Sequence, residues 1–310
     1  MDNTGSKYYY SRLNDGQKRV YNDICGALLR FEPMLNVRRI SAAEISKVMN
    51  YVLLDNPVFF YLNKKRVATA KTIFGLTLMF HYDYSENDAK IMWQKAQSVL
   101  DEFMQTRINP NMPPLAKQIE AHRWIQQNIK TANAPYTPEC FSLVGALINK
   151  TCVCQGFAQT YKMICDRLHL ASIIVSGTAI KPDKSTEPHA WNITRIDGVT
   201  SHIDVTWDTV CGIGSYDYFN LTDDEISADH IFDRTVYPKC NDNSLGYFTL
   251  NQLVARSECE LKSLIAANRQ KPHFSVKLEF PCTAPFLANC GFPPGELRYN
   301  EARNIVFYKR

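Results

Sequence analysis

Cys154, His189 and Asp204 are the residues whose types and spacing suit them best to chemistry. A cysteine that opens a helix is stabilised as a thiolate by the helix dipole and by the free N–H groups of the first turn, which can also bind an oxyanion. A histidine oriented by a carboxylate can act as the base for such a thiol. We therefore predict Cys154 as the nucleophile, His189 as the general base and acid, and Asp204 as the residue that orients His189.

A predicted hairpin brings this histidine to its carboxylate. Asp197-Gly198 lies between two β-patterned runs and predicts a two-residue turn that pairs Ile196 with Val199. In that register His189 and Asp204 are diagonal neighbours with backbones about 7 Å apart, a gap that polar side chains can bridge. The two-residue period places six side chains on one face: His189, Trp191, Ile193, His202, Asp204 and Thr206.

The elements that must position these residues are helices followed by strands. Apolar residues at helical spacing predict helices over residues 14–31, 42–54, 86–106, 115–129, 154–168 and 247–268. Runs rich in β-branched and aromatic residues predict strands over residues 72–84, 173–175, 189–196, 200–207, 275–280 and 304–308. A helix followed by an antiparallel sheet is an α+β layout.

The proline-rich run Asn109-Pro110-Asn111-Met112-Pro113-Pro114 interrupts the helical pattern and predicts a boundary. We expect a mainly helical N-terminal extension over residues 1–113 and a catalytic core over residues 114–310. A chain of 310 residues is long enough for one large domain or two small ones.

Four blocks of the sequence resemble the transglutaminase-like superfamily. They are Cys-Val-Cys-Gln-Gly-Phe-Ala over residues 152–158, His-Ala-Trp-Asn over 189–192, His-Ile-Asp-Val-Thr-Trp-Asp over 202–208 and Tyr-Phe-Asn-Leu-Thr-Asp-Asp over 218–224. All four occur in the family's order within about a hundred residues. The N-terminal third resembles the helical extension of bacterial members of the cysteine-protease type.

This resemblance implies a papain-like fold in which the helix bearing the nucleophile packs on an antiparallel sheet. It implies the same roles for Cys154, His189 and Asp204 as the residue types do. The departure is Cys152, where the family commonly has glycine. We interpret Cys152 as structural, with redox pairing or persulfide chemistry as the alternative.

Three further residues are candidates for substrate binding or for the oxyanion site. Gln155 would supply part of an oxyanion hole or cap the helix, and the residue type does not decide between these roles. Gly156 lacks a side chain, which would let a substrate backbone approach closely. Trp191 would pack in the core or wall the site. His202 shares the face of Asp204 and is an alternative base.

A metal site is the rival interpretation, since Cys152, Cys154, Cys165, His169, His189 and His202 carry suitable donor atoms. Cys-x-Cys is not the usual Cys-x-x-Cys knuckle, however, and no second knuckle follows at zinc-ribbon spacing. The glycines form neither a phosphate-binding loop nor a dinucleotide fingerprint. We therefore expect no metal and no organic cofactor.

Composition indicates a globular protein without a nucleic-acid or membrane partner. Hydrophobic residues make up 45% and charged residues 21%, and the net charge is only +4. No signal peptide is visible, so we expect the cytoplasm, with secretion open if the natural chain begins upstream. Most of the ten cysteines fit apolar patterns, while disulfides stay open for Cys211, Cys240, Cys259, Cys282 and Cys290.

Together these features predict thiol-dependent acyl transfer on peptide or glutamine amides, with a protein or peptide as substrate. Hydrolysis of the peptidase type is the first expectation. Transglutaminase or deamidase chemistry is one alternative, and a non-catalytic binding or scaffold protein is another. The sequence does not indicate an oligomeric state.

Overall fold

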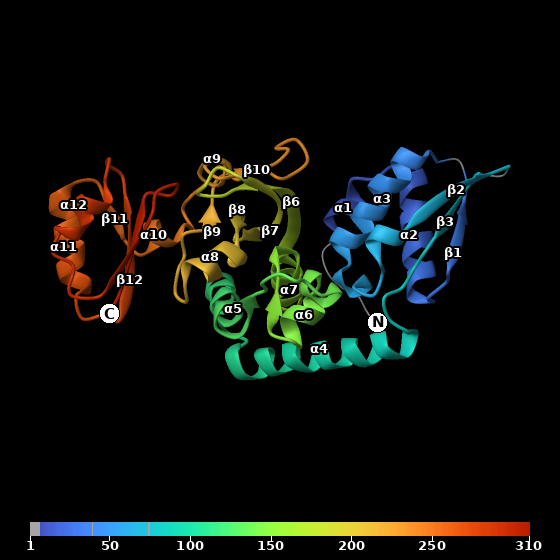
Figure 1. The fold of residues 1–310 in the computed structure, drawn as a ribbon, viewed down its shortest axis with the longest axis horizontal. Coiled ribbons are helices and arrows are strands. Elements are labelled where there is room, and N and C mark those ends of the chain that lie inside the picture. Colours follow the sequence, from blue (N-terminus) through green and yellow to red (C-terminus); the bar gives the residue numbers. More distant parts are fainter. Residues whose placement is uncertain (1–6, 39, 74) are drawn as a thin grey trace. The chain divides into compact units, whose positions relative to one another are not determined.

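A computed structural model of the chain describes residues 7–38, 40–73 and 75–310 (Figure 1). The chain divides into two compact units, each described by itself below. Unit 1 comprises Met1–Glu120 and Ile129–Ile174, and unit 2 comprises Ala121–Asn128 and Val175–Arg310. The fold combines helices with sheets whose strands pair mostly antiparallel, so the fold class is α+β, as predicted.

Unit 1 begins with helices and a small sheet, and its last helix is the one that Cys154 opens. Its elements are α1 (Tyr8–Ser11), α2 (Asp15–Leu29), β1 (Met34–Val37), α3 (Ala42–Asp55), η1 (Pro57–Phe59), η2 (Lys64–Arg66), β2 (Ala68–Thr72), β3 (Gly75–Met79), α4 (Glu86–Arg107), the first half of α5 (Pro114–Asn128), β4 (Lys130–Thr131), η3 (Pro138–Phe141), α6 (Leu143–Leu147), β5 (Thr151–Cys152) and α7 (Cys154–Arg167).

The helices of unit 1 confirm the predicted ones to within about two residues, because their ends carry strong local signals. Asn14 and Ser41 each start a helix with a capping box, in which the cap side chain and the side chain three residues later satisfy each other's backbone N–H groups. α3 ends directly before Asn56 and Pro57, since proline cannot continue the helix.

The N-terminal third also contains a three-stranded sheet in the order β1-β3-β2, so the expectation of a mainly helical segment was incomplete there. The single strand predicted over residues 72–84 is wrong, because the chain forms the hairpin of β2 and β3 instead. Phe74, within that range, lies outside the described residues. A Cβ at Gly75 would lie 2.3 Å from the Val37 carbonyl oxygen, so the adjacent strand requires glycine there.

Unit 2 holds a five-stranded sheet and a four-stranded sheet. Its elements are the second half of α5, β6 (Ala171–Ile180, whose first four residues count to unit 1), β7 (Thr186–Ile196), β8 (Val199–Ile203), α8 (Val205–Cys211), β9 (Phe219–Leu221), α9 (Asp223–Ile226), β10 (His230–Ile231), α10 (Tyr247–Leu250), β11 (Val254–Ala255), α11 (Glu258–Asn268), β12 (His273–Leu278), α12 (Ala284–Ala288), β13 (Glu296–Asn300) and β14 (Ile305–Lys309).

The five-stranded sheet, in the order β10-β6-β7-β8-β9, contains the predicted hairpin in the predicted register. Ile196 pairs with Val199 and Ile193 with His202. Asp197 and Gly198 both have positive φ, as a two-residue turn of this kind requires. The hairpin prediction is therefore confirmed up to the end of β8.

The strand predicted over residues 200–207 is wrong beyond Ile203, where β8 ends and α8 begins at Val205. Asp204 is the N-cap of α8 and accepts hydrogen bonds from the backbone N–H groups of Thr206 and Trp207. Thr206 is therefore helical and does not face His189 across the hairpin. The β-branched and aromatic residues favoured a strand locally, but the aspartate cap favours the helix.

The helix predicted over residues 247–268 is also wrong in its middle. The chain forms the short helix α10, then β11, and only then α11, which Ser257 caps. β11 joins the sheet β11-β12-β14-β13, in which the predicted strands β12 and β14 pair antiparallel. The pairing of β11 with β12 therefore overrides the helical pattern around Val254.

The ten cysteines are free thiols in the structure. Among the described residues, no helix combines the length and the apolar character that crossing a membrane demands.

Candidate active site

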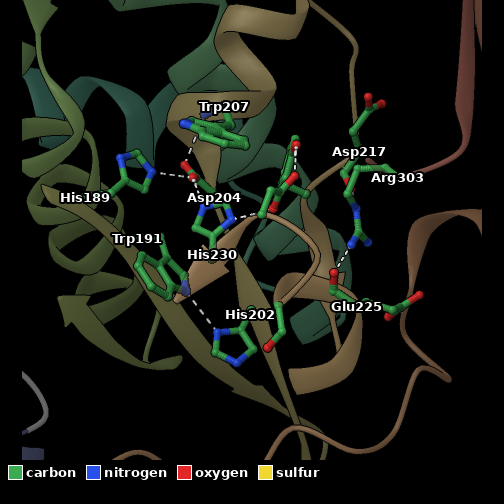
Figure 2. Close-up of polar contacts among 12 residues, drawn as sticks. His189, Trp191, His202, Asp204, Trp207, Asp217, Glu225, His230 and Arg303 are labelled. Carbon is green, nitrogen blue, oxygen red and sulfur yellow. Dashed lines mark hydrogen bonds and ion pairs between the residues drawn. The ribbon is translucent and has the colours of Figure 1, made fainter. Parts of the chain in front are cut away.

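His189 and Asp204 are in direct contact in unit 2, as predicted (Figure 2). His189 comes from β7, and its Nε2 lies 2.6 Å from Oδ2 of Asp204 at the end of β8. The residues are 6% and 0% exposed, so water screens this contact weakly. The geometry fits a carboxylate that fixes the tautomer and orientation of an imidazole.

The two carboxylate oxygens of Asp204 have different partners. Oδ1 accepts the N–H groups of Thr206 at 2.9 Å and Trp207 at 3.1 Å, which anchors it to the start of α8. Oδ2 contacts the ring nitrogens of His189 and His230. Burial alone would raise the pKa of Asp204, but the charge and hydrogen bonds of these two histidines outweigh it and hold the pKa well below its ordinary value.

His230 is a site residue that the sequence reasoning missed. It lies on β10, at the edge of the sheet, where it pairs with Ala179 of β6. Its Nε2 lies 3.1 Å from Asp204 Oδ2, and its Nδ1 lies 2.7 Å from Oδ1 of Asp229. The available signal was the dipeptide Asp229-His230 at the start of a short apolar run, but the strand is only two residues long.

Each ring nitrogen of His230 thus faces a carboxylate oxygen. Carboxylates accept hydrogen bonds only, so both nitrogens are satisfied together when the ring is doubly protonated. Asp229 also accepts a hydrogen bond from the Tyr218 hydroxyl at 2.7 Å, which helps to fix its position. The buried ring therefore bridges Asp204 and Asp229.

Two tryptophans enclose the His189 ring. The ring centroid of Trp191 lies 6.0 Å from that of His189, and that of Trp207 lies 5.7 Å from it. Trp191 is 1% exposed, so it packs against the histidine and offers almost no surface to a ligand. These rings fix the position of His189 and keep water from the hydrogen bond with Asp204.

His202, the alternative base, is hydrogen-bonded through both ring nitrogens to residues other than Asp204. Its Nδ1 accepts the indole N–H of Trp191 at 2.9 Å, and its Nε2 lies 2.9 Å from Oδ1 of Asp223. The indole can only donate, so the proton of neutral His202 lies on Nε2 and points to Asp223. Its burial lowers the pKa of His202. With both nitrogens engaged and 0% exposure, His202 is poorly placed to serve a substrate.

Two groups of side chains have donor atoms close enough to invite a metal: His189 with Asp204 and His230, and His202 with Asp223 and Cys240. In a tetrahedral zinc site the ligand atoms lie about 3.3 Å apart, given bonds of about 2.0–2.1 Å. The 2.6 Å contact in the first group is too short for that. In the second group, the tautomer that Trp191 imposes puts a proton on the nitrogen that would bind. The distances and tautomers in both groups are better explained by hydrogen bonds between the side chains than by a bound metal.

A second buried carboxyl, Asp208, lies one turn along α8 from Asp204. Its Oδ2 is 2.9 Å from Nε2 of His122, and its Oδ1 accepts the backbone N–H of Tyr218. Burial, followed by repulsion from Asp217, raises the pKa of Asp208 well above its ordinary value. Burial lowers the pKa of His122 to about 3. Burial thus favours the uncharged form of each partner, whereas the pKa of Asp204 is held low.

Cys154 is the first residue of α7 in unit 1, as predicted. Its N-cap, Val153, has no side chain that accepts a hydrogen bond, so the first turn lacks a side-chain cap. Val153 itself is held by a hydrogen bond from its N–H to the Cys140 carbonyl oxygen at 2.9 Å. Cys154 is partly exposed, and uncapped N–H groups next to it are potential oxyanion donors.

Cys152 differs from Cys154 in its surroundings. It is 0% exposed on β5, and burial raises the pKa of its thiol. A Cβ at Gly156 would lie 2.6 Å from the Cβ of Cys152 and 2.8 Å from the carbonyl oxygen of Ser142. Gly156 is therefore required by the packing of Cys152, and the expectation that it makes room for a substrate is not needed to explain it.

The structure thus joins His189, Trp191 and Asp204 within unit 2 and places Cys154, Gln155 and Gly156 together at the start of α7 in unit 1. Gln155 is half-buried on the first turn. The meeting of Cys154 with His189 is a prediction from the residue types and is taken up below.

Comparisons with known proteins give only a distant likeness. The chain matches no known protein-family profile and no curated protein sequence. Among solved structures it is similar to a transglutaminase, with 12% identity and a TM-score of 0.32 over 56% of this chain and 49% of that one. It is also similar to a proposed cysteine protease from Cytophaga hutchinsonii, with 13% identity and a TM-score of 0.29 over 46% of this chain and 61% of that one. The chain thus spans less than two thirds of either.

Proposed function

We propose that this chain is a thiol-dependent acyl-transfer enzyme of the papain-like, transglutaminase-like type that hydrolyses peptide or glutamine amides. Cys154 is the nucleophile, His189 the base and acid, and Asp204 the residue that orients His189. The observation that carries the proposal is the buried 2.6 Å contact between His189 Nε2 and the ionised Asp204. In a triad of this kind the carboxylate orients the imidazole, and the imidazole exchanges a proton with the nucleophile.

The reaction follows from these roles. The Cys154 thiolate adds to the amide carbonyl, and N–H groups at the start of α7 bind the oxygen that becomes negative. The C–N bond breaks as His189 gives its proton to the leaving amine, which leaves a thioester. Water then adds as His189 takes one of its protons, and the C–S bond breaks to release the carboxylic acid. The proposal requires Cys154 to reach His189 in the working enzyme.

Two contrasts support Cys154 over its neighbour Cys152 as the nucleophile. Cys154 is partly exposed and begins a helix that lacks a side-chain cap. Cys152 is fully buried, and its raised pKa disfavours the thiolate that attacks carbonyls. Water is the proposed acceptor, and a lysine amine in its place would give cross-linking by the same thioester.

The experiment combines two readouts on the wild type and on Cys154→Ala, His189→Ala and Cys152→Ala. Glutamine-containing peptides are incubated with and without a primary amine, and mass spectrometry measures hydrolysis, deamidation and amine incorporation. Intact mass after a short quench measures the acyl-enzyme. We expect hydrolysis and a trapped thioester in the wild type and in Cys152→Ala only. Equal activity in Cys154→Ala would overturn the proposal, and amine incorporation without hydrolysis would change the acceptor.

A further inference from the structure

A pocket of about 290 Å³ opens in unit 1 next to the proposed nucleophile. Its walls come from the end of α3, from η1, η2 and η3, and from α7. The residues from α7 are Gln155, which directly follows Cys154, and Gln159, one helical turn later. The volume is at the lower end of the range for small-ligand sites, about 300–1,000 Å³, which suits one large side chain better than a cofactor.

The lining of this pocket is rich in aromatic and apolar side chains. Phe59 and Leu62 line the pocket and are buried, each 3% exposed. Tyr136 and Phe141 also line it, yet they are 51% and 41% exposed, with ring centroids 5.7 Å apart in an edge-to-face arrangement. Exposed aromatic pairs beside a hollow are typical of sites that bury an apolar group on binding.

Gln159 adds a polar group to this apolar lining. The residue is only 4% exposed, and its Oε1 accepts the backbone N–H of Leu143 at 3.0 Å. Within the described part of the chain, its Nε2 has no hydrogen-bond partner. An amide donor at the wall of a pocket needs an acceptor to offset its desolvation, and a peptide carbonyl oxygen would supply one.

The rim of the pocket is positively charged. Lys64 and Lys65 of η2 are both exposed there. The carboxylate that also lines the pocket, Asp83, accepts a hydrogen bond from Asn63 at 2.7 Å. The start of α7 adds the positive end of a helix dipole. The charge therefore favours an acidic ligand.

We propose that this pocket binds the acyl side of a peptide substrate: an aromatic or large aliphatic side chain fills it, and an acidic residue of the same peptide meets Lys64 and Lys65. The inference rests on the proposed function, because Gln155 places the pocket beside Cys154. The Nε2 of Gln159 then donates to a carbonyl oxygen of the bound peptide. The N-terminal extension and residues 136–159 of the core thus share in setting the specificity of the site.

The test measures binding apart from turnover. Full-length Cys154→Ala is titrated against fluorescein-labelled peptides in which Glu-Phe stands one, two or three residues before a glutamine, and anisotropy gives the Kd. We expect Phe→Ala in the best peptide to weaken binding about tenfold to a hundredfold. Changing its Glu to Lys should weaken binding about threefold to tenfold and make it less sensitive to salt.

Variants of the protein locate the site. Lys64→Glu with Lys65→Glu should weaken binding of the Glu-Phe peptide by about threefold to tenfold, whereas Arg66→Glu is the matched control, since Arg66 belongs to η2 but does not line the pocket. Gln159→Glu keeps the acceptor for Leu143 but loses the amide donor, and we expect it to weaken binding. Because the new carboxyl is buried, urea unfolding checks that the variant remains folded under the binding conditions.

The outcomes separate this inference from the proposed function. If peptides bind with the expected pattern but the wild type does not turn them over, the proposed peptide-binding pocket is supported and the proposed enzymatic function is overturned. If the wild type turns over peptides regardless of their aromatic and acidic residues, the proposed enzymatic function is supported and the proposed peptide-binding pocket is overturned. Equal effects of Arg66→Glu and the double lysine variant would also overturn it, since the charge would then act without a site.

Discussion

His189 and His230 contact the same atom, Oδ2 of Asp204, at 2.6 Å and 3.1 Å, from two different strands of one sheet. A triad needs only the first of these contacts. The second places another imidazole against the same carboxylate oxygen, and His230 also reaches Asp229. His189 and His230 therefore share the negative charge of Asp204. How strongly Asp204 orients His189 should depend on the contact that His230 makes.

Asp204→Asn and Asp208→Asn form a matched pair of changes one helical turn apart. Asparagine at 204 cannot accept from His189 as a carboxylate does, and we expect turnover to fall by about 10⁴, as in the comparable serine triad. Asparagine at 208 resembles the protonated acid that the raised pKa of Asp208 favours, so unfolding free energy should change by less than about 1 kcal/mol. Initial rates and urea unfolding check both, and near-normal turnover in Asp204→Asn would refute the assignment.

The lowered pKa of Asp204 also predicts how stability depends on pH. In the unfolded chain an aspartate titrates near about 3.9, and the folded group titrates below that value. The stability it contributes is therefore fully present above about pH 4 and is lost as the pH falls toward the lowered pKa. The gap in unfolding free energy between wild type and Asp204→Asn should be constant above about pH 5 and shrink below about pH 4. A gap unchanged down to pH 3 would contradict the geometry.

His230→Gln removes the group between two buried carboxylates. Leaving them without their shared partner should lower the free energy of unfolding by about 3–5 kcal/mol. Adding Asp229→Asn removes one of the two charges, so the double variant should be more stable than the sum of the single changes predicts. Urea titration of the four proteins measures the coupling. The ¹⁵N shifts of the His230 ring give an independent readout, and a ring nitrogen without a hydrogen-bond partner would contradict the bridge between the two carboxylates.

The neighbouring thiols should differ in their reaction with iodoacetamide at about pH 5.5, where an unperturbed thiol of pKa about 8.5 is almost wholly protonated. Cys154 is partly exposed and should be modified, while Cys152 is fully buried and should not. Cys154→Ala should abolish labelling and turnover, and Cys152→Gly should retain both. Peptide mapping by mass spectrometry decides the matter, and modification of Cys152 in the native protein would mean that the nucleophile is wrongly assigned.

Gly156→Ala tests the packing around Cys152. The new Cβ would meet the Cβ of Cys152 at 2.6 Å, so the variant should lose about 1–3 kcal/mol of stability. Cys152→Gly removes that neighbour and should recover part of the loss, with the Ser142 carbonyl oxygen accounting for the rest. A double-mutant cycle from thermal or urea unfolding gives the coupling energy. Strict additivity would show that the two residues do not share this space.

The sequence predicted the parts of the site that local rules control. Asp197-Gly198 set the register of β7 and β8, and this brought His189 to Asp204. The sequence did not predict that the strand ends just before Asp204. The residues that follow are β-branched and aromatic and favour a strand, whereas the observed helix α8 depends on Asp204 as its N-cap. His230 was missed because a two-residue strand gives almost no periodic signal, and its position depends on pairing with distant β6.

The prediction of one continuous helix over residues 247–268 was wrong for a similar reason. A stretch with helical spacing became α10, β11 and α11, because two residues gain ladder hydrogen bonds to β12 that the local pattern cannot reveal. The helix starts at Asn14, Ser41 and Cys154 were predictable because each is decided within one turn of chain.

The two carboxylate oxygens of Asp204 have different partners, so the backbone amides bound to one oxygen report on the histidines bound to the other. Oδ1 holds the backbone amides of Thr206 and Trp207 while Oδ2 holds the histidines. Whatever displaces or neutralises the carboxylate therefore also loosens those two amides. Their hydrogen–deuterium exchange would register the state of the His189–Asp204 pair in solution, with no substrate identified and no turnover required.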